Sequence, residues 1–211
     1  MDILEQAWQF AGQYQTEFWD ALKIHIILCL AALALAVAIC VPLGVWTSRR
    51  GRGTMLVLNS FGAARALPSL AVLFLLYPLL GIGFLPALVA LTLLACPHLL
   101  IGTDVGLRGI DPAISEAGRG MGMSPLRLLR QVQLPLALPL IIGGVRSAAV
   151  EVIASATLAY LIGAGGLGFF LFAGLARNRP EILLVGAIPI ALLALVSEAL
   201  LASLQRLFKY N

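Results

Sequence analysis

The sequence predicts an all-α, polytopic membrane protein with about five transmembrane helices. Of the 211 residues, 61% are hydrophobic and only 11% are charged, and the mean hydropathy is +1.00. A soluble domain has about 45–50% apolar and about 25% charged residues, so this chain has more apolar surface than a soluble core could bury. Charge-poor stretches of span length also recur along the chain, and each span takes about 20 residues. The length therefore suits five spans and leaves no room for a large soluble domain.

Residues 1–23 are expected to form an amphipathic helix at a membrane interface. Apolar residues recur there every three or four positions, which is the spacing of one helix face, and the opposite face is polar or acidic. Trp8 and Trp19 are of the residue type that anchors such helices at the level of the headgroups. A short soluble cap is the alternative interpretation.

The transmembrane domain is expected over residues 24–205, followed by a cytosolic tail over 206–211. Its five expected spans run over 24–46, about 56–80, about 85–103, about 136–162 and 182–204. The first span, at a rise of about 1.5 Å per residue, is about 34 Å long and can cross the hydrocarbon core.

Lys and Arg residues are distributed unevenly between the two sides of this arrangement. Most of those outside the spans lie in segments 47–55, 104–135 and 205–211, which five spans place on one side. The positive-inside rule assigns that side to the cytoplasm. The N-terminus is therefore expected outside and the C-terminus inside, with the polar segment 104–135 facing the cytosol.

The cytosolic segment 104–135 is expected to contain two short helices separated by glycines. Asp111-Pro112 and Ser124-Pro125 are both typical helix starts, with a capping side chain followed by proline at the first helical position. The glycines within 120–122 break the first helix, and Pro135 is expected to end the second. Another protein could bind such a compact unit and displace it as one body.

This segment resembles the EAA loop of ABC importer permeases. The pattern is Glu-Ala followed by Ala or Gly, three residues, Gly, nine residues, an aliphatic residue, any residue and Leu-Pro. It is matched here by Glu116, Ala117, Gly118, Gly122, Val132, Leu134 and Pro135. In that family the loop forms the coupling helix, which docks in a groove of the ATP-binding subunit. The alternative interpretation is a solvated loop that merely links two spans.

The resemblance covers about residues 40–205 and is closest to the osmoprotectant permeases, which carry glycine betaine, choline or carnitine. Similar stretches are Arg65–Ala71, Pro78–Gly83, Leu134–Pro139, Gly144–Arg146, Ala156–Ala159 and Ile162–Gly168. The stretch Leu100–Asp104 departs from the Arg-Asn-Thr sequence that often follows the third span in that family.

The resemblance implies the type I ABC importer permease fold in a bacterial inner membrane, with a quaternary amine as substrate. It also implies an ATP-binding subunit that holds ATP and Mg, an extracytoplasmic substrate-binding protein, and a second permease subunit that is identical or related. An importer for an amino acid such as methionine is the alternative within the same class.

Charged residues within spans point to a candidate translocation path. Such residues are costly in a bilayer and usually face protein or a water-filled interior. Ser147, Glu151 and Ser155 recur every four positions, so they form a polar stripe on one face of the fourth span. This stripe and Arg65 are the candidate path, and the alternative is a structural role in tying helices together.

Two further charges in the spans are expected to find different partners. Arg146 lies about 140° from Glu151 around the helix, so we expect it to pair with another span or across a dimer. Glu198 lies near the cytosolic end of the fifth span and is expected to be solvated or to pair with Arg206.

Other function classes lack the motifs that they require. No Gly-x-x-x-x-Gly-Lys-Ser/Thr loop is present, so we expect no ATP hydrolysis, no cofactor and no enzyme activity in this chain. Residues 163–168 fit Gly-x-Gly-x-x-Gly but follow a membrane helix, and are expected to form tight turns outside the cell. His25 and His98 are isolated, so no metal site is expected, and no nucleic-acid partner either. A secondary carrier or membrane enzyme is disfavoured because neither an internal repeat nor a polar catalytic cluster is found.

Overall fold

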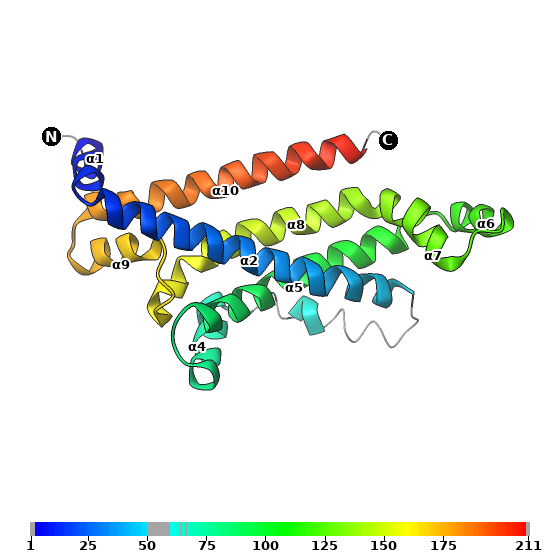
Figure 1. Ribbon diagram of the computed structural model, residues 1–211, viewed down its shortest axis with the longest axis horizontal. Coiled ribbons are helices and arrows are strands. Elements are labelled where there is room, and N and C mark those ends of the chain that lie inside the picture. Colours follow the sequence, from blue (N-terminus) through cyan, green and yellow to red (C-terminus); the bar gives the residue numbers. More distant parts are fainter. Residues whose placement is uncertain (1–2, 50–59, 64, 66, 210–211) are drawn as a thin grey trace.

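The computed structural model describes residues 3–49, 60–63, 65 and 67–209, and within them every regular element is a helix (Figure 1). The elements are α1 (Ile3–Gln13), α2 (Gln15–Ser48), α4 (Ser69–Leu80), α5 (Phe84–Arg108), α6 (Pro112–Gly120), α7 (Pro125–Leu128), a π-helical turn (Leu129–Gln133), α8 (Leu134–Ala156), a 3-10 turn (Leu158–Ile162), α9 (Gly168–Ala176) and α10 (Pro180–Lys209). The predicted all-α class is confirmed.

Four helical runs are long and apolar enough to cross a membrane: α2, α5, the run from α7 through α8, and α10. The second expected span, 56–80, falls partly outside the described residues. Its described part is α4, whose 12 residues span about 18 Å, short of a hydrocarbon core of about 30 Å. The count of five spans therefore stays a prediction.

The N-terminal segment 1–23 is divided between two helices. α1 ends at Gln13, and α2 begins at Gln15 and continues without interruption through the first expected span. No glycine or proline interrupts the sequence between Gln15 and Pro42, so nothing there breaks the helical hydrogen-bond pattern. α1 packs against the first part of α10 through an apolar cluster that includes Ala7 and Val185.

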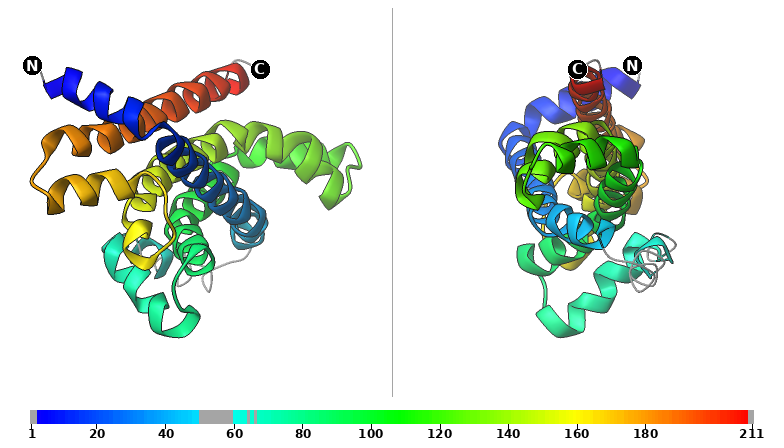
Figure 2. Two further views of the ribbon diagram at one scale, coloured as in Figure 1. Left: turned by 60° about the vertical axis from the view of Figure 1, so that its left-hand side comes forward. Right: turned by 90° about the vertical axis from the view of Figure 1, so that its right-hand side faces the viewer.

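The core lies where α2, α5 and α8 pack together (Figure 2). Small side chains such as Ala32, Ala36 and Ala90 are fully buried there, which lets the helix backbones approach closely. α5 and α8 cross closely, because a Cβ built on Gly102 would lie 3.0 Å from the Cα of Gly144.

The elements are arranged along one long axis (Figure 1). α1 and α9 lie at one end, and α6 and α7 lie at the opposite end, together with the C-terminal ends of α2 and α5. α10 runs along one side, packing against α1 and α9 at its start and against α8 further along. The fold therefore gathers the predicted cytosolic segment at one end of the helix bundle.

Candidate coupling segment and translocation path

The predicted pair of short helices is present in the segment 111–135. The Asp111 carboxylate accepts a hydrogen bond of 2.9 Å from the backbone N–H of Ala113 at the start of α6. Ser124 Oγ accepts one of 3.4 Å from the N–H of Arg127 at the start of α7. Between the helices, Gly122 has a φ of +78°, a left-handed conformation that disfavours any residue with a Cβ. The turn thus sets the angle between α6 and α7.

One face of α6 packs on the helix that follows it, and the other is left open. A Cβ on Gly118 would lie 2.5 Å from Leu128 Cδ1, and Ser115 Oγ accepts a hydrogen bond of 3.2 Å from Gln133 Nε2. Glu116 and Ala117 point away from this contact and are exposed. The start of the EAA pattern is therefore available to a partner protein.

The expectation that Pro135 ends the second helix is wrong. α7, the π-helical turn and α8 form one continuous helix, in which the N–H of Leu134 bonds to the carbonyl of Leu129. The missing N–H of Pro135 falls where the bonding pattern changes from π to α, so the helix loses little there. Val132 and Leu134 are half-buried and Pro135 is exposed. The segment 111–135, which we call the coupling segment, consequently runs directly into a membrane helix.

The polar stripe on α8 runs from an exposed position at Ser147 to a buried one at Ser155. Ser147 is exposed and Glu151 is half-buried, while the buried Ser155 donates a hydrogen bond of 3.0 Å from Oγ to Glu151 Oε1. Arg65, the fourth candidate, lies apart from the stripe in the segment before α4, and it is exposed.

Two of these candidates, Arg65 and Glu151, lie near the same residue, His98 on α5. Its imidazole lies close enough to both Arg65 and Glu151 to interact with them electrostatically, and its Nδ1 atom is buried without a hydrogen-bond partner in the described part of the chain. From the sequence, His98 was assessed only as a possible metal ligand, because an isolated histidine carries no spacing signal that would indicate another role. Within the described ranges, no group of three potential metal ligands occurs.

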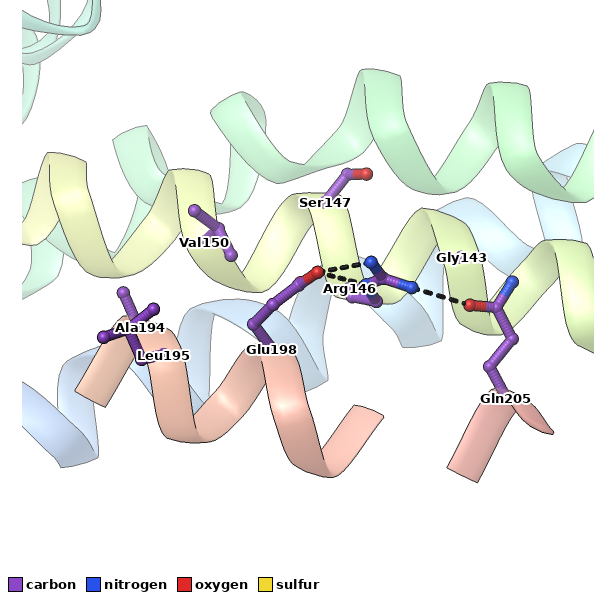
Figure 3. Close-up of a pocket in the computed structure, with 8 residues that line it drawn as sticks. All are labelled: Gly143, Arg146, Ser147, Val150, Ala194, Leu195, Glu198 and Gln205. Carbon is purple, nitrogen blue, oxygen red and sulfur yellow. Dashed lines mark hydrogen bonds and ion pairs between the residues drawn. The ribbon is translucent and has the colours of Figure 1, made fainter. Parts of the chain in front are cut away.

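A polar cleft separates α8 from the second part of α10 (Figure 3). Arg146 Nε donates a hydrogen bond of 2.6 Å to Glu198 Oε1, and Nη2 of the same guanidinium also contacts that oxygen. Arg146 Nη1 donates to Gln205 Oε1 at 3.0 Å, and Gln205 Nε2 donates to the carbonyl of Pro139 at 2.8 Å. Arg146 thus pairs with another span, as expected, whereas the expectation that Glu198 is solvated or pairs with Arg206 is wrong.

The cleft holds a cavity of about 590 Å³ beside this ion pair. We call this feature the α8–α10 cleft. Its lining residues are Gly143, Arg146, Ser147, Val150, Ala194, Leu195, Glu198 and Gln205. The side chains of Arg146 and Glu198 are 36% and 37% exposed. Because a half-exposed ion pair is costly against lipid, this cleft has to be covered by water or by another protein. Ser147 belongs both to the cleft and to the polar stripe, so the exposed end of the stripe adjoins the cleft.

Comparison with known proteins places this architecture in a family. Residues 40–210 match the model of the binding-protein-dependent transport system inner membrane component. The chain is 43% identical to the carnitine transport permease protein OpuCB of Listeria monocytogenes, covering 86% of this chain and 83% of that protein. It is 41% identical to the choline transport system permease protein OpuBB of Bacillus subtilis, covering 86% and 84%.

A solved structure gives independent support for the fold. The methionine ABC transporter MetNI, in an inward-facing conformation, includes a chain that superposes with a TM-score of 0.74 at 21% sequence identity, covering 90% of this chain and 97% of that one. The chain therefore belongs to the family of inner membrane components of binding-protein-dependent transport systems, which are multi-pass permeases of ABC transporters.

Proposed function

We propose that this chain is the permease subunit of an ABC importer that takes up a quaternary amine osmoprotectant such as glycine betaine, choline or carnitine. The observation that carries the proposal is the folded coupling segment, in which Glu116 and Ala117 are exposed on a short capped helix. Relatives named as carnitine and choline permeases support the substrate class. The fold-level similarity to a methionine transporter carries no argument for methionine, because identity is only 21%.

A separate ATP-binding subunit displaces the coupling segment, and the coupling segment transmits this displacement to the spans. The exposed Glu116 and Ala117 make the contact with that subunit. The other residues that match the family pattern shape the segment: Gly118, Gly122, Val132, Leu134 and Pro135. Because α7 continues into α8, a displacement of α7 moves the helix that carries Ser147, Glu151 and Ser155. ATP and Mg belong to the ATP-binding subunit, and their binding and hydrolysis drive the spans between inward- and outward-facing states.

The rest of the assembly follows from the family's dependence on a binding protein. An extracytoplasmic substrate-binding protein delivers the substrate, and a second permease subunit, identical or related, completes the path. The N-terminus lies outside and the C-terminus in the cytosol, with five spans between them. In this arrangement, residues 1–23 lie at the outer interface and 206–211 form the cytosolic tail.

The candidate path suits a cation whose nitrogen carries no hydrogen to donate. A quaternary ammonium is held by charge and by aromatic faces rather than by hydrogen bonds to its nitrogen. Glu151 supplies a negative charge next to the exposed Ser147, and the buried Ser155 orients its carboxylate through a hydrogen bond. Arg65, interacting with the same His98 as Glu151, provides an opposing positive charge. The binding protein supplies most of the chemical selectivity.

Two substitutions in the coupling segment test the coupling role. Glu116→Lys reverses the exposed charge, and Gly122→Val forces a Cβ into a left-handed backbone conformation. We expect both to abolish uptake while the permease remains inserted in the membrane. Gly12→Val is a matched control in α1, because a Cβ on Gly12 would contact nothing within 4 Å. Uptake that survived both coupling variants would contradict the proposal.

The substrate class is tested by uptake of labelled glycine betaine and choline in cells with and without the gene. Competition by other quaternary amines should reduce the gene-dependent signal. If the assembled transporter carried methionine but no quaternary amine, the amino-acid alternative would replace the present one. The path is tested separately by Glu151→Gln, which should change the uptake rate or apparent affinity, and unchanged values would remove Glu151 from the path.

A further inference from the structure

A buried carboxylate joins two membrane helices at the end of the bundle where the coupling segment begins. Asp104 on α5 is 2% exposed. Its Oδ1 accepts a hydrogen bond of 3.1 Å from Thr47 Oγ1 on α2, and its Oδ2 accepts one of 2.8 Å from Arg108 Nε on α5. Hydrogen bonds to a charged group inside protein are short and directional, so they set the relative positions of the two helix ends.

Arg108 adds a second connection between the same two helices. Its Nη2 donates a hydrogen bond of 2.8 Å to the backbone carbonyl of Thr47, in the last turn of α2. The last carbonyls of a helix lack partners within the helix and carry partial negative charge, which favours an arginine there. At the same level, a Cβ on Gly44 would lie 2.6 Å from Thr103 Cβ, so the two backbones are already in close contact. The ends of α2 and α5 are therefore held as one unit.

This unit adjoins the coupling segment at both ends. Arg108 is the last residue of α5, and a short turn leads from it to Asp111, which caps α6. On the other side, Arg49 Nη2 approaches the carbonyl of Pro125, the first residue of α7, at 3.5 Å. The end of α2 thus contacts the segment that the ATP-binding subunit is expected to displace (Figure 1).

α2 differs from α5 and α8 in how a displacement of the coupling segment can reach it. α8 is continuous with α7, and α5 leads into α6 through a short turn. The coupling segment lies far from Thr47 in sequence, so motion reaches α2 through side-chain and packing contacts rather than along the chain. Apolar attraction by itself has no preferred direction, whereas a buried hydrogen-bonded ion pair adds a defined geometry to the close packing of the two helix ends.

We propose that Thr47, Asp104 and Arg108 form an α2–α5 lock, which transmits movement of the coupling segment to α2 and thereby couples ATP hydrolysis to transport. The three residues act as positioning residues and do not contact substrate. The inference rests on the proposed function as an ABC importer permease, and it adds the route by which α2 follows the ATP-binding subunit.

The test measures substrate carried per ATP hydrolysed by the complete transporter in proteoliposomes, with its ATP-binding subunit and binding protein. Asp104→Asn removes the charge. Thr47→Val leaves the ion pair in place and removes the hydroxyl that donates to Asp104 at 3.1 Å and, within α2, to the Gly44 carbonyl at 2.9 Å. We expect both variants to hydrolyse ATP but to carry roughly threefold to tenfold less substrate per ATP. Thr92→Val is the matched control, because among the described residues the buried Thr92 hydroxyl bonds only within its own helix, to the Leu88 carbonyl at 2.7 Å.

The outcomes separate the lock from the proposed function. If Asp104→Asn assembles poorly, Thr47→Val against Thr92→Val decides the question. An unchanged ratio in Thr47→Val and in assembled Asp104→Asn would overturn the lock, even if melting temperatures fell, and so would an equal loss in Thr92→Val. Failure of the unmodified transporter to carry any quaternary amine, or survival of uptake in Glu116→Lys and Gly122→Val, would instead refute the proposed function.

Discussion

The two neighbours of α8 make different contacts with it. Against α5 the contact is dry and close, and a Cβ on Gly144 would lie 2.7 Å from the carbonyl oxygen of His98. Against α10 the contact is polar and open, with the Arg146–Glu198 pair beside a cavity of about 590 Å³. One helix therefore presents a packed face and a wettable face to its own subunit.

This difference indicates how α8 combines rigidity with transport. Close backbone packing resists displacement because interiors have low compressibility, so α5 and α8 are expected to move together. A polar contact with empty space beside it can rearrange by exchanging hydrogen bonds with water. We therefore expect changes at the α5 face to affect folding, and changes at the α8–α10 cleft to affect transport.

The largest effect should come from adding one methyl group at the dry face. In Gly144→Ala the new Cβ meets backbone atoms of α5, which cannot rotate away, so we expect a loss of about 3 kcal/mol in the free energy of unfolding. Gly143→Ala is the control one position earlier, where a Cβ would meet the flexible Gln205 side chain at 3.2 Å, and the change should stay within about 1 kcal/mol. Thermal unfolding of the purified permease in detergent measures both. Equal losses in the two variants would contradict the distinction between the faces.

A smaller effect on stability, with a larger one on transport, is expected in the cleft. Glu198→Ala leaves the Arg146 guanidinium without its carboxylate, so the melting temperature should fall by less than in Gly144→Ala. Replacing both members, as in Arg146→Met with Glu198→Met, should recover the melting temperature, because no charge is left without a partner. Uptake should stay impaired in the double variant if the cleft belongs to the path. Recovery of uptake together with stability would make the pair purely structural.

Water access distinguishes the two faces without changing stability much. With the three native cysteines replaced, Ser147→Cys on the open face should react with a trimethylammonium methanethiosulfonate reagent, and an excess of transported amine should slow the reaction. Ala148→Cys, at a position that is fully buried, should not react. Equal labelling of the two positions would show that the open face is no wetter than the core.

The smallest effect is expected at the end of the cleft. Gln205→Leu removes the hydrogen bonds to Arg146 and to the Pro139 carbonyl, and each such bond contributes about 1 kcal/mol or less at a partly exposed site. The melting temperature should therefore change by only a few degrees, with uptake reduced modestly. A loss of folding in this variant would mean that the cleft is as critical to the fold as the α5 face.

Local signals along the chain predicted where the two short helices of segment 111–135 begin. Asp111-Pro112 and Ser124-Pro125 do start helices, because capping depends on a few adjacent residues. The interpretation of Pro135 as a helix end was wrong, because a π-helical turn absorbs its missing N–H. Gly102 and Gly106, four residues apart on α5, both lie against backbone atoms of α8.

Partners between distant segments were much harder to predict. The sequence indicated that Arg146 must find a partner on another helix but not which one, and Glu198 was matched with Arg206, which lies closer along the chain. The α2–α5 lock was missed because Asp104 and Arg108 appeared as ordinary charges of a cytosolic segment. Their partner Thr47 carries no signal of its own in the sequence.

Composition, periodicity, charge placement and the EAA pattern are local or additive properties of the chain, so they sufficed to predict the class of this protein. Which polar groups lie together depends on how the helices pack: Asp104 contacts Thr47, Arg146 contacts Glu198, and His98 lies within electrostatic range of Arg65 and Glu151. The physical reason is that a buried charge has to find a partner wherever the packed helices place one. That placement depends on the crossing of helices at residues such as Gly102 and Gly144, and on the side of α8 that is left open.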